Sequence, residues 1–292
     1  MMSRGNLRIC LAPNSRADFR PHTSYPVITI VTPTFNRAST LPRLYESLLK
    51  QTHQDFEWVV VDDGSSDATS ELIKNWQQAN AIRVQYIFQR NAGKHIALNT
   101  GVTHAQGDII FIVDSDDAIT EDAIRNISDK FAESDHAKLS GLCFRKVKFD
   151  GTLVGREIAL DSIYATANDA GKMFRGDLAY VFKRAAMQGN PFPQIPGEKF
   201  VPELYIWNKI SDTGNILFFP RIAIYLCDYL IDGYTSNFTA TLRNNPKGFL
   251  LFYIDQVKRE KSPLLKIKYA IRAFQCLYFR AAKLFKRKAL KN

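Results

Sequence analysis

Four apolar, strand-like runs constrain the fold of this chain most strongly, because each is separated from the next by a polar turn and an amphipathic stretch. The runs cover residues 27–32, 56–61, 83–88 and 108–113. After the first run, leucines and a tyrosine recur at helical spacing, and Ser39 is placed to cap the helix. This alternation predicts an α/β fold with a mostly parallel central sheet and helices on both faces. In such sheets, ligands bind at the carboxyl ends of the strands.

The fourth run ends in a cluster of acids, in which Asp114, Asp116 and Asp117 follow directly after Val113. Carboxylates this close raise one another's pKa unless a cation or a bound partner compensates them. In an extended segment, Asp114 and Asp116 would point to the same side with Cα atoms roughly 6.6 Å apart. That spacing suits one hard divalent cation. The alternative is that one aspartate caps a helix beginning near Thr120, although capping requires one carboxylate and not three.

The second part of the chain shows a different pattern. An apolar run at 142–149, the turn at 150–151 and a further run from Leu153 predict a β-hairpin. Pro202 and the acid after it favour the first turn of a helix, and residues 216–226 are typical of a strand.

Composition narrows the class of protein. With 292 residues, of which 46% are hydrophobic, the chain can bury the core of a large globular domain. Its four cysteines lie far apart without a Cys-x-x-Cys pair or a histidine cluster, which argues against a zinc site or a disulfide framework and favours a reducing compartment. Residues 1–25 are expected to form a flexible arm. We predict no signal peptide and no spanning helix, because no apolar stretch is long enough.

The net charge of +10 belongs to the C-terminal tail. Residues 258–292 hold twelve Lys or Arg and one acid, Glu260, so the tail carries +11 and the remainder −1. An apolar stripe recurs every three or four residues from Leu264 to Phe285, which predicts a basic amphipathic helix. Two interpretations stay open: an interfacial helix attracted to anionic lipid, or a helix packed on its own domain with a solvated basic face. Nucleic-acid binding is not predicted, because the stripe itself explains the aromatic residues.

Four motifs resemble the N-terminal half of family 2 glycosyltransferases. They are Val-Thr-Pro-Thr-Phe-Asn-Arg at 31–37, Val-Asp-Asp-Gly-Ser-Ser-Asp at 61–67, Asn-Ala-Gly-Lys at 91–94 and Val-Asp-Ser-Asp-Asp at 113–117. They occur in the family's order and spacing. The resemblance implies a GT-A nucleotide-binding fold with a helical C-terminal extension. It also implies an inverting, metal-dependent hexosyltransferase that moves a sugar from a nucleoside diphosphate sugar, with uridine as the expected nucleoside, to a hydroxyl group of a glycan or lipid-linked saccharide.

The same resemblance divides the chain. Residues 26–235 would form the GT-A domain, with a nucleotide-sugar half at 26–130 and an acceptor half at 131–235, and residues 236–292 would form the helical extension. The expected location is cytoplasmic, with peripheral attachment to the inner face of the plasma membrane through the tail and a role in cell-envelope polysaccharide synthesis.

The resemblance also implies the nucleotide-binding residues, some of which have simpler explanations. The nucleotide would contact Pro33, Thr34, Phe35, Arg37, Asp62, Asp63 and Lys94. For Asp62 and Asp63 the alternative is turn and cap formation, because Asp and Gly favour turns for backbone reasons. Lys94 would lie near the phosphates or the base edge, whereas an isolated lysine is usually a solvated surface charge.

The sequence Asp114-Ser115-Asp116 matches the DXD motif of the family. By that match, Asp114 contacts ribose or metal, and Asp116 coordinates Mn²⁺ or Mg²⁺ on the diphosphate. A cation on the diphosphate offsets the charge that develops on the leaving group. Asp117 would be a helix cap or a supporting group.

An inverting transfer requires a carboxylate that takes the proton of the acceptor hydroxyl. Glu203 resembles the acid that the family carries at the start of a helix beside the acceptor pocket, and Glu198 and then Asp177 follow as candidates. The alternative for Glu203 is a preference for a helix N-terminus. A competing hypothesis is a nucleotide-sugar binding or scaffold protein without transferase activity. The sequence lacks the glycine motifs of dinucleotide-dependent oxidoreductases and of phosphate-loop nucleotidases, which argues against both classes.

Overall fold

The computed structural model describes residues 27–135, 137–228 and 238–289. The arm expected at 1–25 and the domain boundary expected at 235–236 lie outside the described residues.

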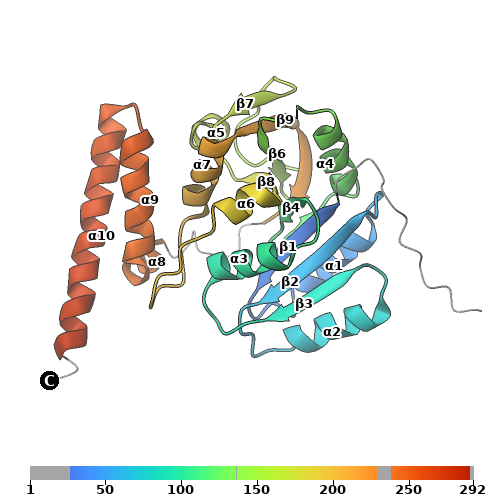
Figure 1. The fold of residues 1–292 in the computed structure, drawn as a ribbon, viewed down its shortest axis with the longest axis horizontal. Helices are drawn as coiled ribbons and strands as arrows, with labels where there is room; N and C mark the ends of the chain where they lie inside the picture. Colours follow the sequence, from blue (N-terminus) through green and yellow to red (C-terminus); the bar gives the residue numbers. More distant parts are fainter. Residues whose placement is uncertain (1–26, 136, 229–237, 290–292) are drawn as a thin grey trace, which may run out of the picture.

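One nine-stranded sheet organises the structure, in the order β3-β2-β1-β4-β8-β6-β9-β5, with β7 paired to β9 (Figure 1). The four predicted strands of the first part are present as β1 (Ile28–Thr34), β2 (Phe56–Asp62), β3 (Val84–Phe88) and β4 (Ile109–Ile112). They pair in parallel, so their carboxyl ends meet at one edge of the sheet.

Helices cover both faces of the sheet, as predicted. On one face, Leu44 of α1 (Leu41–Leu49), Ile73 of α2 (Thr69–Ala79) and Ile127 of α4 (Ala123–Ala132) pack with alternate strand residues such as Ile30 and Trp58. The other face carries α3 (Lys94–His104), α5 (Ala167–Phe174), α6 (Arg184–Gly189) and α7 (Glu203–Thr213). The predicted α/β fold is therefore confirmed.

The second half of the sheet is more mixed than the sequence predicts. It comprises β5 (Ala118–Ile119), β6 (Leu139–Val147), β7 (Ile163–Ala165), β8 (Leu178–Lys183) and β9 (Asn215–Leu226). Strand β8 lies between β4 and β6 and is antiparallel to both, whereas β6 and β9 are parallel. The predicted hairpin at 150–151 is present only as a short turn: an antiparallel bridge joins Val147 to Leu153, and the amide of Lys148 donates to the carbonyl oxygen of Thr152 (2.8 Å). The pairing stays short because β8 occupies this edge of β6 from Gly141 to Arg145, which leaves only the end of β6 for the returning chain.

Two predicted helix starts also differ. Helix α1 follows Thr40 and not Ser39, and the Thr40 hydroxyl donates instead to the carbonyl oxygen of Ser115 (3.1 Å). Helix α4 begins at Ala123, and the two-residue strand β5 separates it from the acid cluster, so no aspartate of that cluster caps it.

The C-terminal part consists of α8 (Phe238–Asn244), α9 (Pro246–Arg259) and α10 (Pro263–Ala289), which confirms the predicted tail helix. Helices α9 and α10 form an antiparallel hairpin beside the sheet domain (Figure 1). Among the described residues, no helix is both long enough and apolar enough to span a bilayer.

Candidate functional site

The candidate site lies where the parallel strands end. Thr34 at the end of β1 is in register with Asp62 at the end of β2, and Val31 is in register with Ile112 of β4. The turns that follow these strands therefore meet at one edge. This is where the sequence predicts a ligand.

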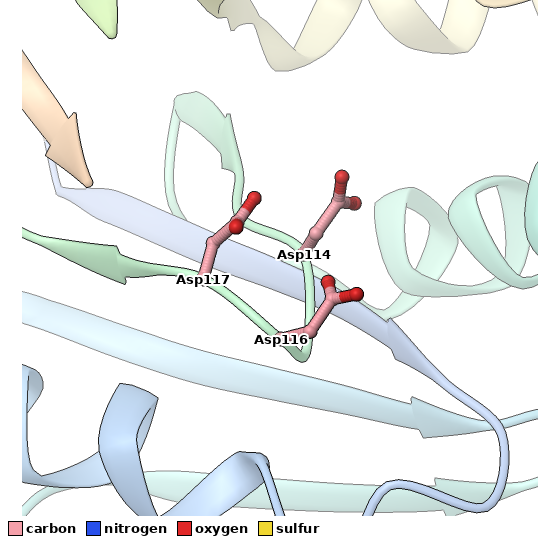
Figure 2. A group of neighbouring side chains, drawn as sticks. All are labelled: Asp114, Asp116 and Asp117. Atoms are coloured by element: carbon pink, nitrogen blue, oxygen red, sulfur yellow. The ribbon is translucent and has the colours of Figure 1, made fainter. Parts of the chain in front are cut away.

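The acid cluster occupies the turn between β4 and β5. Asp114, Asp116 and Asp117 each present a carboxylate oxygen, and the three oxygens lie within 4.8 Å of one another. Figure 2 shows the three side chains rising from this turn in the same general direction. The amide of Asp117 donates to the carbonyl oxygen of Asp114 (3.2 Å), and the guanidinium of Arg43 donates to the carbonyl oxygen of Asp116. The turn is thus held by its backbone, which leaves the carboxylates for other partners.

Tyr225 at the end of β9 connects two members of this cluster. Its hydroxyl donates to Oδ2 of Asp117 (2.8 Å) and accepts from the amide of Asp114 (2.9 Å). Asp117 is 6% exposed, and burial, with the nearby Asp114 charge, raises its pKa to about 7. Asp117 is therefore a supported, buried member of the cluster and not a helix cap.

Cations surround the acids. A terminal nitrogen of Arg37 lies 4.0 Å from Oδ2 of Asp116, and the ammonium of Lys146 lies 3.8 Å from the centre of the Tyr225 ring. Burial would raise the pKa of Asp114, but Lys94, with help from Lys146 and Arg37, lowers it. Asp114 is therefore stabilised as a carboxylate by positive charge.

Lys94 joins the acid cluster to the start of α7. As the first residue of α3, it places its ammonium 2.7 Å from Oδ1 of Asp114 and 2.8 Å from Oε1 of Glu203, the first residue of α7. Burial alone would lower the pKa of Lys94, but these two carboxylates raise it well above its usual range. The neighbouring Gly93 permits this arrangement, because it has φ +98° and a Cβ atom there would lie 2.1 Å from the carbonyl oxygen of Lys199.

The aspartates at the end of β2 are engaged within the protein. The buried carboxylate of Asp62 accepts from the Ser65 amide (2.7 Å) and the Tyr86 hydroxyl (2.8 Å). Asp63 accepts from the amides of Ala92 and Gly93, both at 2.8 Å. Both residues therefore shape turns, as the backbone alternative predicts. An ionised carboxylate has about four acceptor positions, so these bonds leave capacity for a further donor.

The turn after β1 is tied to the turn after β2. Pro33 and Thr34 are buried at the end of β1, and Phe35 is 47% exposed. Asn36 has a left-handed backbone, and its side-chain oxygen accepts from the amide of Ser66 (2.8 Å). The two predicted nucleotide-side turns form one connected edge, with the Phe35 ring open to solvent.

Of the three candidate bases, Glu203 is linked to the acid cluster through Lys94, because Glu203 and Asp114 both pair with that ammonium group. Glu198 instead accepts from the amides of Lys247 and Gly248 at 2.9–3.0 Å, at the N-terminus of α9. Asp177 is exposed just before β8. Its charge acts on the thiol of Cys227, beyond the end of β9.

Three residues of the site were not predicted from the sequence: Arg43, Lys146 and Tyr225. Lys146 and Tyr225 are paired across β6 and β9, which lie far apart in the chain. No local motif marks them, and only the strand pairing brings them to the acids.

The carboxylate oxygens of the acid cluster are suitable ligands for a hard divalent cation. The set of ligands consists of carboxylate oxygens only, it is partly open to solvent, and it contains neither sulfur nor imidazole. Such ligands suit Mg²⁺ or Mn²⁺, which keep coordination positions for phosphate and water.

Relatives of known name are glycosyltransferases. A "GalNAc(5)-diNAcBac-PP-undecaprenol beta-1,3-glucosyltransferase" of Campylobacter jejuni is 27% identical over 206 residues, covering 68% of this chain and 64% of its own length. "Glycosyltransferase GlyA" of Streptococcus pneumoniae is 38% identical over 106 residues, covering 36% of this chain and 15% of its own length. The chain thus spans less than two thirds of these two relatives.

Two solved structures share this fold. S. aureus TarS 1–349 in complex with UDP-GlcNAc superimposes with a TM-score of 0.66 at 18% identity, over 87% of this chain and 72% of TarS 1–349. The mannosyltransferase PcManGT from Pyrobaculum calidifontis, in complex with GDP-Man and Mn²⁺, gives a TM-score of 0.58 at 21% identity, over 90% of this chain and 75% of its own. These likenesses confirm the GT-A fold.

The family profile described as "Glycosyl transferase family 2" matches residues 29–176. That match covers just over half of the chain and includes all four motifs and the acid cluster. The chain belongs to glycosyltransferase family 2.

Proposed function

We propose that this protein transfers a sugar, with inversion at the anomeric carbon, from a nucleoside diphosphate sugar to a hydroxyl group of a glycan or lipid-linked saccharide. The observation that carries the proposal is the position of Lys94 between Asp114 and Glu203. One ammonium group pairs with an acid of the nucleotide-sugar half and an acid of the acceptor half. Donor and acceptor chemistry therefore meet around a single cation.

Asp116 and Asp114 would hold a divalent cation, with Asp117 supporting the turn through Tyr225. When bound, the ion would supply positive charge to the diphosphate leaving group. Lys94 and Arg37 add further positive charge at the same edge. The Mn²⁺ in the PcManGT complex supports this assignment.

Glu203 is the proposed base. In the reaction, its carboxylate takes the proton from the acceptor hydroxyl while the hydroxyl oxygen forms a bond to the anomeric carbon. The bond from that carbon to the phosphate oxygen breaks, and its electron pair leaves with the diphosphate. The ion pair with Lys94 holds the Glu203 carboxylate beside the acid cluster, which is the position that this proton transfer requires.

For the donor we propose a uridine diphosphate sugar, supported by the UDP-GlcNAc complex of TarS. The nucleoside would contact the edge formed by Pro33, Thr34, Phe35, Asp62 and Asp63. Lipid-linked saccharides are the proposed acceptor class, supported by the undecaprenol-linked substrate in the name of the Campylobacter relative.

A donor screen followed by a base variant tests the proposal. Nucleotide sugars are first compared for thermal stabilisation of the protein with Mn²⁺ and with a chelator, because a ligand that binds the native state raises the melting temperature. Release of the diphosphate in the presence of saccharide acceptors is then measured. Glu203→Gln is expected to bind the donor like wild type and to lose turnover by about 10²-fold or more. Donor binding without diphosphate release for any acceptor would favour the scaffold hypothesis.

A further inference from the structure

Helix α10 exposes its most apolar face. Side chains at three- and four-residue spacing lie along this face, with exposed fractions of 79% for Leu264, 58% for Ile267, 62% for Ile271, 71% for Phe274 and 69% for Tyr278. We call these five residues the apolar stripe. Their spacing places them on one side of the helix. An exposed row of large apolar side chains is unusual on a soluble surface and indicates a contact with another phase or molecule.

The opposite side of α10 makes the contact with α9. Cys276 is fully buried there, with Tyr269, Ala273 and Phe279 packed against the cluster that contains Phe249 and Tyr253 of α9. Figure 1 shows α10 on the far side of α9 from the sheet domain. One face of α10 is therefore buried against α9, and the apolar stripe on the other face is exposed to solvent.

The charge of α10 indicates what kind of partner binds the apolar stripe. The helix contains eight Lys or Arg and no Asp or Glu. Lys266 and Lys268 are both exposed close to the apolar stripe. Two copies packed through this face would bring like charges together with no acid to pair them, which disfavours self-association. An anionic lipid surface offers both an apolar layer and compensating negative charge.

We propose that α10 lies in the interface of an anionic bilayer, with the apolar stripe inserted between lipid headgroups and the exposed Lys266 and Lys268 on the phosphates. This attachment is peripheral, in keeping with the absence of a spanning helix among the described residues. It is independent of the proposed sugar transfer, because it requires neither donor nor acceptor.

The α9–α10 hairpin contacts α7, the helix that begins with Glu203. Arg259 of α9 pairs with Asp212 of α7 (2.7 Å), and the Asn208 amide of α7 donates to Asp255 of α9 (3.3 Å). Helix α7 begins at Glu203. A bilayer that fixes α10 would thereby fix the acceptor side of the site relative to the lipid surface.

Vesicle sedimentation of the full chain tests the proposal. The probes are vesicles of phosphatidylcholine alone and vesicles with about one third phosphatidylglycerol. Wild type is expected to sediment with the anionic vesicles and at least about tenfold less with the neutral ones. The double variant Ile271→Ser/Phe274→Ser should lose binding to anionic vesicles by at least about tenfold, since each side chain contributes through its buried apolar area. Lys266→Gln/Lys268→Gln should weaken it and reduce its salt dependence.

The matched control removes exposed apolar side chains elsewhere. Leu160 and Tyr164 are 46% and 54% exposed on the sheet domain, and Leu160→Ser/Tyr164→Ser should sediment like wild type. Circular dichroism confirms that each variant is folded. Equal sedimentation of wild type and the stripe variant overturns the proposal. A second result would also overturn it: wild type does not bind anionic vesicles but forms a dimer, and Ile271→Ser/Phe274→Ser dissociates that dimer. The apolar stripe would then bind a second copy of the chain.

Discussion

The ammonium nitrogen of Lys94 lies 2.8 Å from Oε1 of Glu203, so the first residue of α3 is joined to the first residue of α7. A lysine at a helix N-terminus is unfavourable for the helix dipole, whereas a glutamate there is favourable. The favourable interaction of Glu203 with the dipole of α7 therefore offsets the unfavourable interaction of Lys94 with the dipole of α3. The position of Lys94 is explained by the two carboxylates that it serves and not by the stability of its own helix.

Removal of this cation should disable the site. Lys94→Met removes the ammonium group between Asp114 and Glu203, and we expect kcat/KM for diphosphate release to fall by about 10²-fold or more. Lys94→Arg retains the charge and is expected to retain more activity. If Lys94→Met is as active as wild type, the ion pair has no role in transfer.

The metal assignment is tested at Asp116. We expect Asp116→Asn to lower Mn²⁺ affinity by more than about tenfold and to abolish Mn²⁺-dependent stabilisation by the donor, because a carboxylate ligand becomes a neutral amide. Calorimetric titration measures the affinity. The exposed Asp129 of α4 provides the control, and Asp129→Asn should titrate like wild type. Unchanged Mn²⁺ binding in Asp116→Asn would place the ion elsewhere.

Tyr225 should matter through its hydroxyl group. Tyr225→Phe retains the ring, which packs edge-on against Phe111, but removes the bonds to Asp117 and to the Asp114 amide. Supporting groups of this kind typically change metal affinity by about 10- to 100-fold. We expect a loss of Mn²⁺ affinity in that range, and a loss of about 1–3 kcal/mol of unfolding free energy because the buried Asp117 loses its hydrogen-bond partner. Tyr164→Phe, at an exposed position, is the control, and equal Mn²⁺ affinity in both variants would contradict the role.

Glu198 should behave as a structural residue. Glu198→Ala removes the acceptor for the Lys247 and Gly248 amides at the start of α9, and loss of such a cap costs about 1–2 kcal/mol of unfolding free energy. Urea denaturation measures that cost, and kcat should stay close to wild type. The opposite result, a folded and equally stable variant without turnover, would make Glu198 the base.

The attachment of the hairpin to α7 should depend on pH. The side-chain hydrogen bond from Arg259 lowers the pKa of Asp212 below its ordinary value of 3.8. Because the pKa of Asp212 is lower in the folded state than in the unfolded state, the stabilisation is fully present above pH 3.8. It is lost as the pH falls through the folded-state pKa. Asp212 is 54% exposed, so we expect Asp212→Asn to cost less than about 1 kcal/mol near neutral pH.

Hydrogen exchange of the α9 amides, corrected for intrinsic rates, measures this effect. Wild type and Asp212→Asn should differ above the ordinary pKa of Asp212 and converge in more acidic solution. A difference that persists unchanged into acid would mean that the charge of Asp212 is not responsible.

Much of the fold could be predicted because its signals are local. The strands β1 to β4 and the helices between them follow from apolar periodicity, and the parallel pairing brings their terminal motifs together. The insertion of β8 between β4 and β6 has no local signal, since it depends on which edges remain unpaired. For the same reason, Tyr225 and Lys146 escaped prediction, and Glu198 could not be separated from Glu203 without knowing that α9 lies beside it.

Once Asp117 is ionised, at pH values above its raised pKa of about 7, four acids around the turn (Asp114, Asp116, Asp117 and Glu203) face four cations (Arg37, Arg43, Lys94 and Lys146), and the site is close to electrically balanced. A divalent cation alone, or a diphosphate alone, would disturb this balance. Together they add almost no net charge. Metal and donor are therefore expected to bind with positive cooperativity, each raising the affinity for the other by the same factor.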